Sequence, residues 1–273
     1  MKKVISKWND YKYRFVPWIA FNIKNRSSRI VQSKEKDKII TDKEVIDTLL
    51  QVLPKFYRQD GRTENSLLAK RNSEVMTKVM GFNISRAPSS ISGMKGSGLG
   101  VFIRNGVAPK GSLVALYPGT IYRTFEPILL QSLGNPFIFR CLDGTHIDGK
   151  DTGISKIIYK SCVGRDSVGG LATSDLSWLT RHNINPLNVG QYVNNQSKDA
   201  ACNVAYQEVE VPEDGTILPL PLLSLLPNAF YSANISDSSP HAFIRKRRMV
   251  ALISIVDIPQ DSEVLSSYFT IVH

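Results

Sequence analysis

The chain has 273 residues, of which 42% are apolar and 21% charged, with 34 basic and 24 acidic side chains. This size and composition suffice for one hydrophobic core and a smaller second unit, which excludes disorder throughout. The best candidate for a membrane span, residues 218–226, is interrupted by prolines, so the sequence predicts no membrane-spanning helix. The three cysteines lack a Cys-x-x-Cys pair, which indicates reduced thiols of an intracellular protein.

The positive charge is concentrated in the first third of the chain. Residues 1–86 hold 19 basic and 9 acidic side chains, a net charge of +10, whereas residues 87–273 hold 15 of each. This asymmetry predicts a region that attaches to nucleic acid, an acidic partner or anionic lipid; a solvated basic surface is the alternative. Residues 1–31 resemble neither a signal peptide nor a strong transit peptide. We therefore expect the nucleus or cytoplasm, with a mitochondrial address as the alternative.

The first elements in chain order are two helices. Thr41 and Glu44 form a capping box, and apolar residues follow at helical spacing as far as Leu53, so a helix is expected that ends at Pro54. A second helix is predicted over residues 73–80, with Gly81 as its left-handed cap. Residues 1–92 are therefore expected to form a basic, largely helical N-terminal region.

Beyond Pro88 the sequence has the texture of strands and turns. Residues 137–142 and 145–147 flank Asp143-Gly144 and predict a hairpin with a two-residue turn. Residues 249–258 predict a strand that is buried on both faces. Residues 128–187 have weak periodicity and are expected to form an irregular insert. The fold class is mostly β with helices (α+β), and residues 93–273 are expected to form the second domain.

Several other motifs do not indicate a catalytic site. The glycines at 96, 98 and 100 precede a strand rather than a helix, so they do not form a dinucleotide-binding loop. The aspartates at 143, 148 and 151 are typical of turns, the four histidines are too scattered for a metal cluster, and no Gly-x-Ser-x-Gly elbow occurs. Residues 245–248 predict a nuclear address, a nucleic-acid patch or a basic tip that leads into a buried strand.

Four segments occur in a definite order between residues 93 and 268. They are Gly98-Leu99-Gly100-Val101-Phe102; Pro109-Lys110-Gly111 with Tyr117-Pro118-Gly119; residues 189–197 with Cys202-Asn203-Val204; and residues 250–258 with Glu263 and Tyr268. In this order they resemble the SET-domain family of protein lysine methyltransferases. The resemblance implies a SET fold of small curved sheets with a threaded C-terminal segment. Residues 121–188 match only as the variable insert of that family.

The resemblance also implies a site for S-adenosylmethionine and for a protein substrate that presents a lysine. It assigns cofactor binding to Gly98, Leu99, Gly100, Asn194, Asn195 and Tyr268, and the catalytic channel to Tyr268 and Tyr117. The chain departs from the family pattern in three places: Asn195 replaces histidine, Gln191-Tyr192 replaces Arg-Phe, and Ser266-Ser267 replaces Tyr-Asp. Five residues follow Tyr268, so we expect no cysteine-rich zinc segment after it and no metal.

The implied function is methyl transfer from S-adenosylmethionine to a neutral side-chain amine. About four in ten thousand free lysines are neutral at pH 7, a penalty of about 4 to 5 kcal/mol. A narrow apolar channel beside a cationic cofactor lowers the pKa of the amine. The alternative is a non-catalytic SET-like binding module, tethered by the basic N-terminal region to chromatin, RNA or an acidic partner. A third hypothesis keeps the chemistry but changes the acceptor to another nitrogen, such as histidine.

Overall fold

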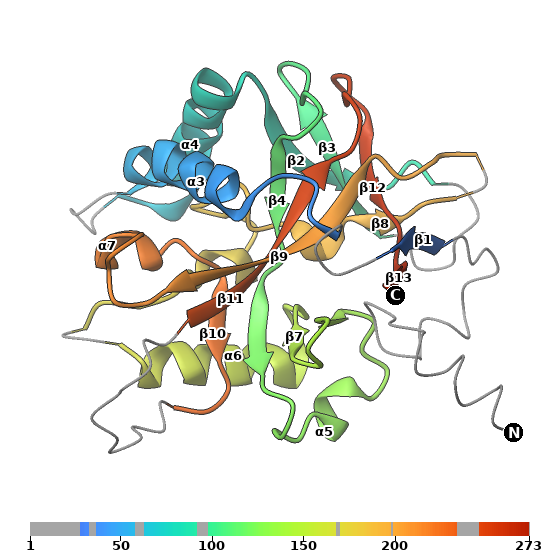
Figure 1. Ribbon diagram of the computed structural model, residues 1–273. Helices are drawn as coiled ribbons and strands as arrows, with labels where there is room; N and C mark the ends of the chain where they lie inside the picture. The colour runs from blue at the N-terminus through green and yellow to red at the C-terminus, as the bar shows by residue number, and fades with distance from the viewer. Residues whose placement is uncertain are drawn as a thin grey trace, which may run out of the picture.

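The computed structural model describes residues 28–32, 37–57, 63–91, 98–167, 170–197, 199–233 and 246–272. Three sheets organise this part of the chain (Figure 1): a seven-stranded sheet in the order β2-β3-β12-β9-β11-β4 with β8 attached to β12, a four-stranded sheet in the order β10-β5-β7-β6, and the pair β1-β13. The expectation of a mostly β fold with helices is confirmed. No helix in these ranges is long and apolar enough to cross a membrane.

The strands are β1 (Ser28–Val31), β2 (Asn83–Pro88), β3 (Leu99–Arg104), β4 (Leu113–Leu116), β5 (Gly119–Tyr122), β6 (Ile138–Arg140), β7 (His146–Asp148), β8 (Asn194–Asn195), β9 (Val204–Pro212), β10 (Asn228–Phe230), β11 (Lys246–Ser254), β12 (Glu263–Ser266) and β13 (Phe269–Val272). The helices are α3 (Asp42–Phe56), α4 (Asn65–Met80), α5 (Leu129–Ser132), α6 (Gly153–Arg165) and α7 (Leu220–Leu223), and the short 3-10 turns are η2 (Ser177–Leu179) and η3 (Gly190–Tyr192).

Helix α3 begins at the predicted capping box. The Thr41 backbone N–H donates to Glu44 Oε2 at 2.6 Å, and the Glu44 N–H donates to Thr41 Oγ1 at 3.2 Å. The prediction that Pro54 ends the helix is wrong, because α3 continues to Phe56. Proline removes only its own N–H from the helix, and the Tyr57 N–H still reaches the Leu53 carbonyl at 2.9 Å.

Helix α4 is twice as long as the predicted 73–80, since it starts at Asn65. Its first half carries Ala, Lys, Arg and Asn rather than a clear apolar stripe, which explains the short prediction. The cap at Gly81 is confirmed, with φ +80° and an N–H bonded to the Thr77 carbonyl. Asn72 is buried and donates to the Ile184 carbonyl at 2.7 Å, so α4 is anchored to the segment that leads to η3.

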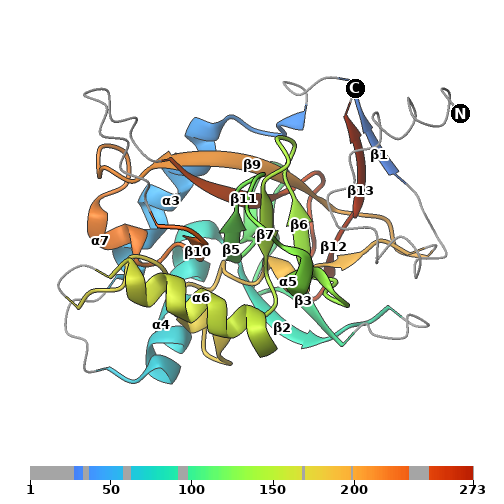
Figure 2. The same ribbon diagram turned by 90° about the horizontal axis from the view of Figure 1, so that it is seen from below.

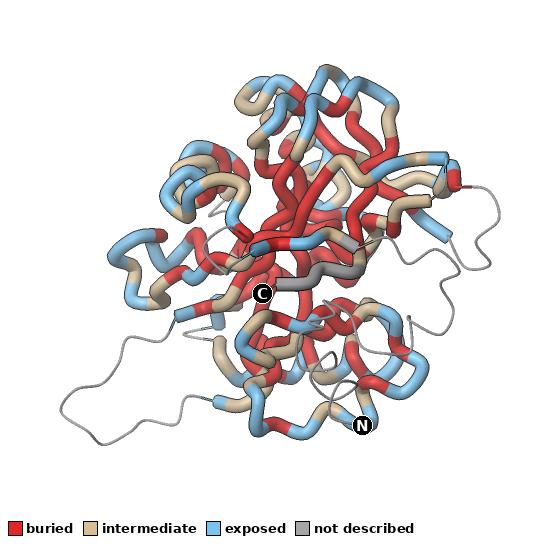
Figure 3. Tube along the Cα trace, turned by 45° about the vertical axis from the view of Figure 1, so that its right-hand side comes forward, coloured by how far each residue is buried: buried red, intermediate tan, exposed pale blue. Residues whose placement is uncertain are grey.

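The helical layer shares its core with the large sheet. Val45, Leu49 and Phe56 of α3 belong to the same buried cluster as Val101 of β3 and Leu252 of β11. Figure 3 shows this buried interior running from the helices through the central strands. Strand β2 pairs with β3 in antiparallel register, so strands from both sides of residue 92 lie in one sheet. The division into domains 1–92 and 93–273 stays a prediction.

The insert at 121–188 contains more regular structure than predicted. Helix α6 packs on β5 and β10 (Figure 2). Its buried residues include Ser155 and Cys162, whereas Ile154 and Ile157 are exposed, which hides the helical period in the sequence. The predicted hairpin forms between β6 and β7, but its turn is longer than two residues because the Cys141 N–H pairs with the Thr145 carbonyl at 2.7 Å.

Strand β11 begins at Lys246 and ends at Ser254, so both of its ends lie earlier in the chain than those of the predicted strand 249–258. Its first residues are basic, and two of them point into ion pairs: Arg247 with Glu213, and Arg248 with Glu208, Glu210 and Asp143. The strand ends at Ser254, where the Ser254 N–H donates to the Ser112 carbonyl. Residues 246–248 therefore form the basic tip that leads into a buried strand, which was one of the three interpretations.

The capping box makes a testable contribution to stability. Thr41→Ala removes the side-chain acceptor at the start of α3 and is expected to lower the free energy of unfolding by about 1 kcal/mol. Thr48→Ala in the middle of the same helix is the control, and it should change stability by no more than about 0.5 kcal/mol because alanine is the better helix former there. Urea denaturation measures both, and equal losses would contradict the assigned cap.

Candidate functional site

The centre of the candidate site is the short parallel pairing of β8 with β12. Leu265 pairs with Asn194 and Ser266 with Asn195, and the Gln196 N–H donates to the Ser266 carbonyl at 2.8 Å. The C-terminal segment thus passes beside the loop that carries the two asparagines, as the resemblance predicted for a threaded segment. Connections of this kind leave no local sequence pattern.

Asn203 braces this junction from β9's side. Its side chain donates to the Glu263 carbonyl at 2.8 Å and accepts from the Leu265 N–H at 2.8 Å. Its backbone N–H also donates to the Leu265 carbonyl at 2.9 Å. Asn203 therefore holds β12 at Glu263 and at Leu265.

The two asparagines play different parts. Asn194 donates from Nδ2 to the Leu99 carbonyl at 3.1 Å and to Glu263 Oε1 at 3.0 Å. Asn195 is buried and accepts at Oδ1 from the Tyr268 N–H at 2.9 Å, while its Nδ2 has no protein partner within the described structure. Leu99, Asn194, Asn195 and Tyr268 are thereby brought together at this junction.

Gly98, which directly precedes β3, and Gly100 of β3 have different surroundings. A Cβ at Gly100 would stand 2.8 Å from Glu263 Cδ and closer still to Oε1, whereas a Cβ at Gly98 would meet no atom of the described residues within 4 Å. Gly100 is therefore small because the Glu263 carboxylate packs against it. The space beside Gly98 is open, which suits the close approach of a ligand.

Tyr117 forms an aromatic cluster with Phe139, with ring centroids 5.4 Å apart, and Tyr268 packs against the same hydrophobic core. Tyr117 is fully buried and its hydroxyl donates to the Phe137 carbonyl at 2.8 Å, and the Tyr268 hydroxyl donates to the Val193 carbonyl at 3.0 Å. Burial raises the pKa of both tyrosines. Both hydroxyls therefore stay protonated in the physiological range and act as hydrogen-bond donors.

Tyr206 is a third member of this cluster that the sequence reasoning missed. Its ring centroid lies 6.4 Å from that of Tyr117 and 5.1 Å from that of Phe139. Its hydroxyl is 2.9 Å from Ser266 Oγ, in the place where the family pattern has a tyrosine. The sequence feature that could have pointed to Tyr206 is its position three residues after Asn203, which places it near the start of β9. The hydrogen-bonded pair of Tyr206 and Ser266 thus takes the place of the tyrosine that the family pattern has at position 266.

The residues present fit a polar ligand such as S-adenosylmethionine. Asn195 Nδ2 is a buried donor without a protein partner in the described structure, and the space beside Gly98 is open. A buried, unsatisfied amide costs about 1–3 kcal/mol, which a ligand acceptor would recover. The hydrogen-bonding side chains at the junction are amides and hydroxyls, which suit an amino-acid or nucleoside ligand.

A separate group could be mistaken for a metal site. Ligand atoms of Cys141, Asp143 and Glu208 lie within 4.8 Å of one another. The Arg248 guanidinium already pairs with Asp143 at 2.9 Å and Glu208 at 2.7 Å. The cation that neutralises these carboxylates is therefore an arginine, and the cluster ties β11 to the β6-β7 turn.

Comparisons with known proteins place the chain in a family. It is 42% identical to human SET domain-containing protein 9, across 98% of this chain and 96% of the human protein. The chain belongs to the SET-domain family. It is 40% identical to the protein of the same name from Pongo abelii, across 89% of this chain and 96% of that protein. A scan against protein-family profiles gives no match.

The family assignment confirms the resemblance and the SET fold class. The solved structure of CpSET8 from Cryptosporidium is similar over 98% of this chain and 90% of that chain, with 12% identity and a TM-score of 0.35. The assignment to the family rests on the two sequence relatives. Membership in the SET-domain family supports a methyltransferase role.

Substitution of the two glycines tests the packing of Glu263. Gly100→Ala is expected to lower the free energy of unfolding by about 1–3 kcal/mol, because the added methyl displaces a carboxylate that is held by several hydrogen bonds. Gly98→Ala is the matched control and is expected to be close to neutral, since its Cβ meets no atom of the described residues within 4 Å. Urea denaturation of both variants measures the difference. Equal effects would contradict the contact between Gly100 and Glu263.

Proposed function

We propose that this SET-domain protein is an S-adenosylmethionine-dependent protein lysine methyltransferase. The observation that carries the proposal is the junction of β8 and β12, where Asn194 and Asn195 lie beside Tyr268. Gly98, Leu99 and Gly100 border the same junction, because Asn194 bonds the Leu99 carbonyl. Cofactor-binding and channel-lining residues thereby meet at one place.

The chain's own residues would hold the cofactor and orient the amine. Gly98 would let a ligand approach the backbone of β3, and the Asn194 and Asn195 amides would hydrogen-bond it. When bound, S-adenosylmethionine supplies a methyl group on its sulfonium that passes to the amine nitrogen and leaves S-adenosylhomocysteine. Tyr117, Tyr206 and Tyr268 would line an apolar channel.

The apolar surroundings of this channel would favour the neutral form of a bound amine. A lysine ammonium that enters apolar surroundings loses hydration, which lowers its pKa and favours release of its proton to solvent. The hydroxyls of Tyr117 and Tyr268 are held by backbone carbonyls, so the positions of both rings are fixed before substrate arrives. Such positioning accounts for a large share of the rate enhancement that an enzyme can provide.

The hydroxyl of Tyr268 is the first group to test. Tyr268→Phe removes its bond to the Val193 carbonyl and is expected to lower the rate of methyl transfer about 10- to 100-fold, because the ring loses its fixed position. Transfer of labelled methyl from S-adenosylmethionine to lysine and histidine peptides measures the rate and separates the two acceptors.

Tyr159→Phe is the matched control for this test. Its hydroxyl also donates to a backbone carbonyl, that of Asp175 at 2.7 Å, but Tyr159 belongs to a separate cluster with Trp178. It is expected to lose about 1 kcal/mol of stability and no activity. A Tyr268→Phe variant that transfers methyl at the full rate would contradict the proposed role.

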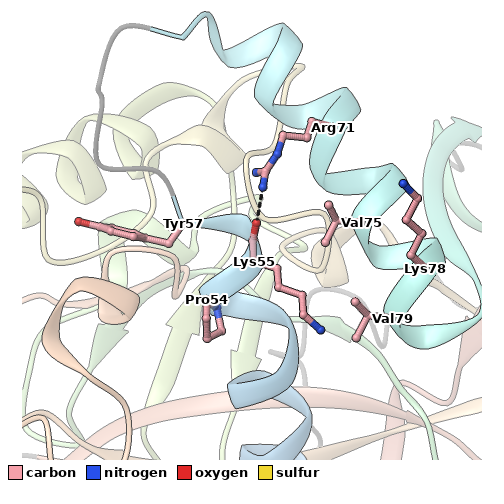
Figure 4. Close-up of a pocket in the computed structure, with 7 residues that line it drawn as sticks. All are labelled: Pro54, Lys55, Tyr57, Arg71, Val75, Lys78 and Val79. Carbon is pink, nitrogen blue, oxygen red and sulfur yellow. Dashed lines mark hydrogen bonds between the residues drawn. The ribbon is translucent and has the colours of Figure 1, made fainter.

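A second candidate function is a binding module, and a basic groove between α3 and α4 favours it. The groove has a volume of about 540 Å³ and is lined by Pro54, Lys55, Tyr57, Arg71, Val75, Lys78 and Val79 (Figure 4). Arg71 donates to the Lys55 carbonyl at 2.8 Å. Three cations around an apolar floor suit a short acidic peptide with apolar residues better than a nucleic acid, which needs a longer track of cations.

Charge reversal in the groove tests this second function. The double variant Lys55→Glu with Lys78→Glu is expected to weaken binding of a fluorescein-labelled peptide of alternating glutamate and leucine about tenfold at 0.15 M salt. Lys38→Glu with Lys43→Glu is the control of equal charge, because those lysines already pair with Asp42 and Asp47. Fluorescence anisotropy measures the affinity. Equal losses in both variants, or tighter binding of an oligonucleotide of equal charge, would argue against a peptide groove.

A further inference from the structure

We propose that the exposed sides of helices α5 and α6 form a docking surface for an anionic lipid bilayer. The inference goes beyond the catalytic proposal and does not depend on it, because it concerns where the protein attaches. The surface, hereafter the α5–α6 face, consists of Phe125, Leu129, Leu130, Leu133, Ile154 and Ile157.

Helix α5 turns its leucines outward. Leu129 is 70% exposed and Leu130 69%, and on either side of them Phe125 is 69% and Leu133 56% exposed. The buried residue of this helix is Ser132, whose hydroxyl donates to the Leu129 carbonyl at 2.8 Å. A helix that packs on a core has the opposite arrangement, with apolar residues inside and polar residues outside. Large apolar side chains gathered in so short a segment indicate an interaction surface, unlike single exposed residues.

Helix α6 repeats this arrangement near its start. Ser155 is buried, whereas Ile154 is 52% and Ile157 68% exposed. Residues three apart in a helix lie on the same side, so the two isoleucines form one apolar strip. The helix packs on β5 and β10 through its other side, so the exposed strip is not part of that contact.

The two helices lie on the same side of the molecule. Asp148 at the end of β7 accepts at Oδ1 from Asn135 Nδ2 at 2.8 Å and from the Lys150 N–H at 3.2 Å. Asn135 follows Leu133 by two residues and Lys150 precedes α6 by three, so one carboxylate joins the end of the α5 segment to the beginning of α6. Figure 1 shows both helices at the lower edge of the molecule, and Figure 2 shows them from that side. The leucines and the isoleucines therefore belong to one side of the protein.

Unpaired cations accompany these apolar side chains. Arg140 ends β6, Lys150 follows β7 and Lys160 lies on α6 beside its exposed isoleucines. None of the three forms an ion pair with another described residue, whereas Arg123 and Glu126 neutralise each other. The α5–α6 face therefore offers positive charge beside apolar side chains, the combination by which peripheral proteins bind anionic membranes.

The shape of the α5–α6 face favours a bilayer over a peptide or a second copy of the chain. Side chains with more than half of their area exposed stand out from the surface, whereas the residues of a peptide-binding groove surround their ligand. The boundary between lipid headgroups and acyl chains is deformable and accepts apolar side chains to a depth of about 5–10 Å. A rigid protein partner would need a matching cavity for each of them.

Sedimentation with sucrose-loaded vesicles tests this surface in the 273-residue chain. At about 0.15 M salt the chain is expected to bind phosphatidylcholine vesicles that contain about 30% phosphatidylserine about tenfold more tightly than vesicles of phosphatidylcholine alone. The double variant Leu129→Ser with Leu130→Ser is expected to weaken binding to the anionic vesicles about tenfold or more, because two apolar side chains no longer enter the lipid. Arg140→Gln with Lys160→Gln should weaken it about tenfold, because two cations no longer attract the anionic headgroups.

Leu67→Ser with Leu220→Ser is the matched control. Both leucines are 60% exposed, but they lie on α4 and α7. This variant should bind the anionic vesicles as the wild type does. Both leucine double variants leave the charge of the basic N-terminal region unchanged, so a difference between them reports the α5–α6 face. Circular dichroism checks that each variant is folded.

Three results would overturn the inference. The first is a folded wild-type protein that does not sediment with the anionic vesicles. The second is a Leu129→Ser, Leu130→Ser variant that binds as tightly as the wild type, or no more weakly than the control, which would assign lipid binding to the basic N-terminal region. The third is a wild-type dimer, measured by light scattering, that the same variant dissociates, which would assign the face to a second copy of the chain.

Discussion

Two residues of parallel pairing between β8 and β12 hold the candidate site together. Asn194 and Asn195 make up a strand of two residues, so the positions of their side chains depend on partners from other segments. Here the partners come from β12 and the residues that follow it: the Glu263 carboxylate and the Tyr268 N–H. Asn203 fixes β12 in turn through three hydrogen bonds. Loss of this pairing would separate the asparagines from Glu263 and Tyr268.

Local signals in the sequence predicted local structure well. The capping box at Thr41 and the glycine cap at Gly81 depend on residues at most four apart, and both form as expected. Non-local contacts explain what was missed. In the sequence Glu263 is only one residue of a motif. Its contacts with Ser90 and Gly100 join segments more than 150 residues apart, so a local sequence pattern does not reveal them. Helix α6 was missed since its buried face includes serine and cysteine.

The basic side chains of the chain have two different environments in the structure. Arg247 and Arg248 come from the run that suggested a nucleic-acid patch, yet they pair with carboxylates on β9 and in the neighbouring turns. Buried pairs of this kind specify how elements meet more than they add stability. Lys55 and Lys78 instead remain exposed at the rim of a groove. Charge counting alone does not separate these two cases, because it ignores which cations already have partners.

The most direct test of the site is an amide spectrum of the ¹⁵N-labelled protein during titration with S-adenosylhomocysteine. The central claim places the ligand at the junction of β8 and β12. We expect the side-chain NH₂ signals of Asn194 and Asn195 and the backbone signal of Tyr268 to shift to saturation, with Asn→Ala variants assigning the side-chain pairs. The side-chain NH₂ signals of the buried Asn228, which donates to the Tyr117 carbonyl, should keep the chemical shifts that they have without ligand. Saturable shifts confined to other regions, or none up to millimolar ligand in a folded protein, would contradict the account.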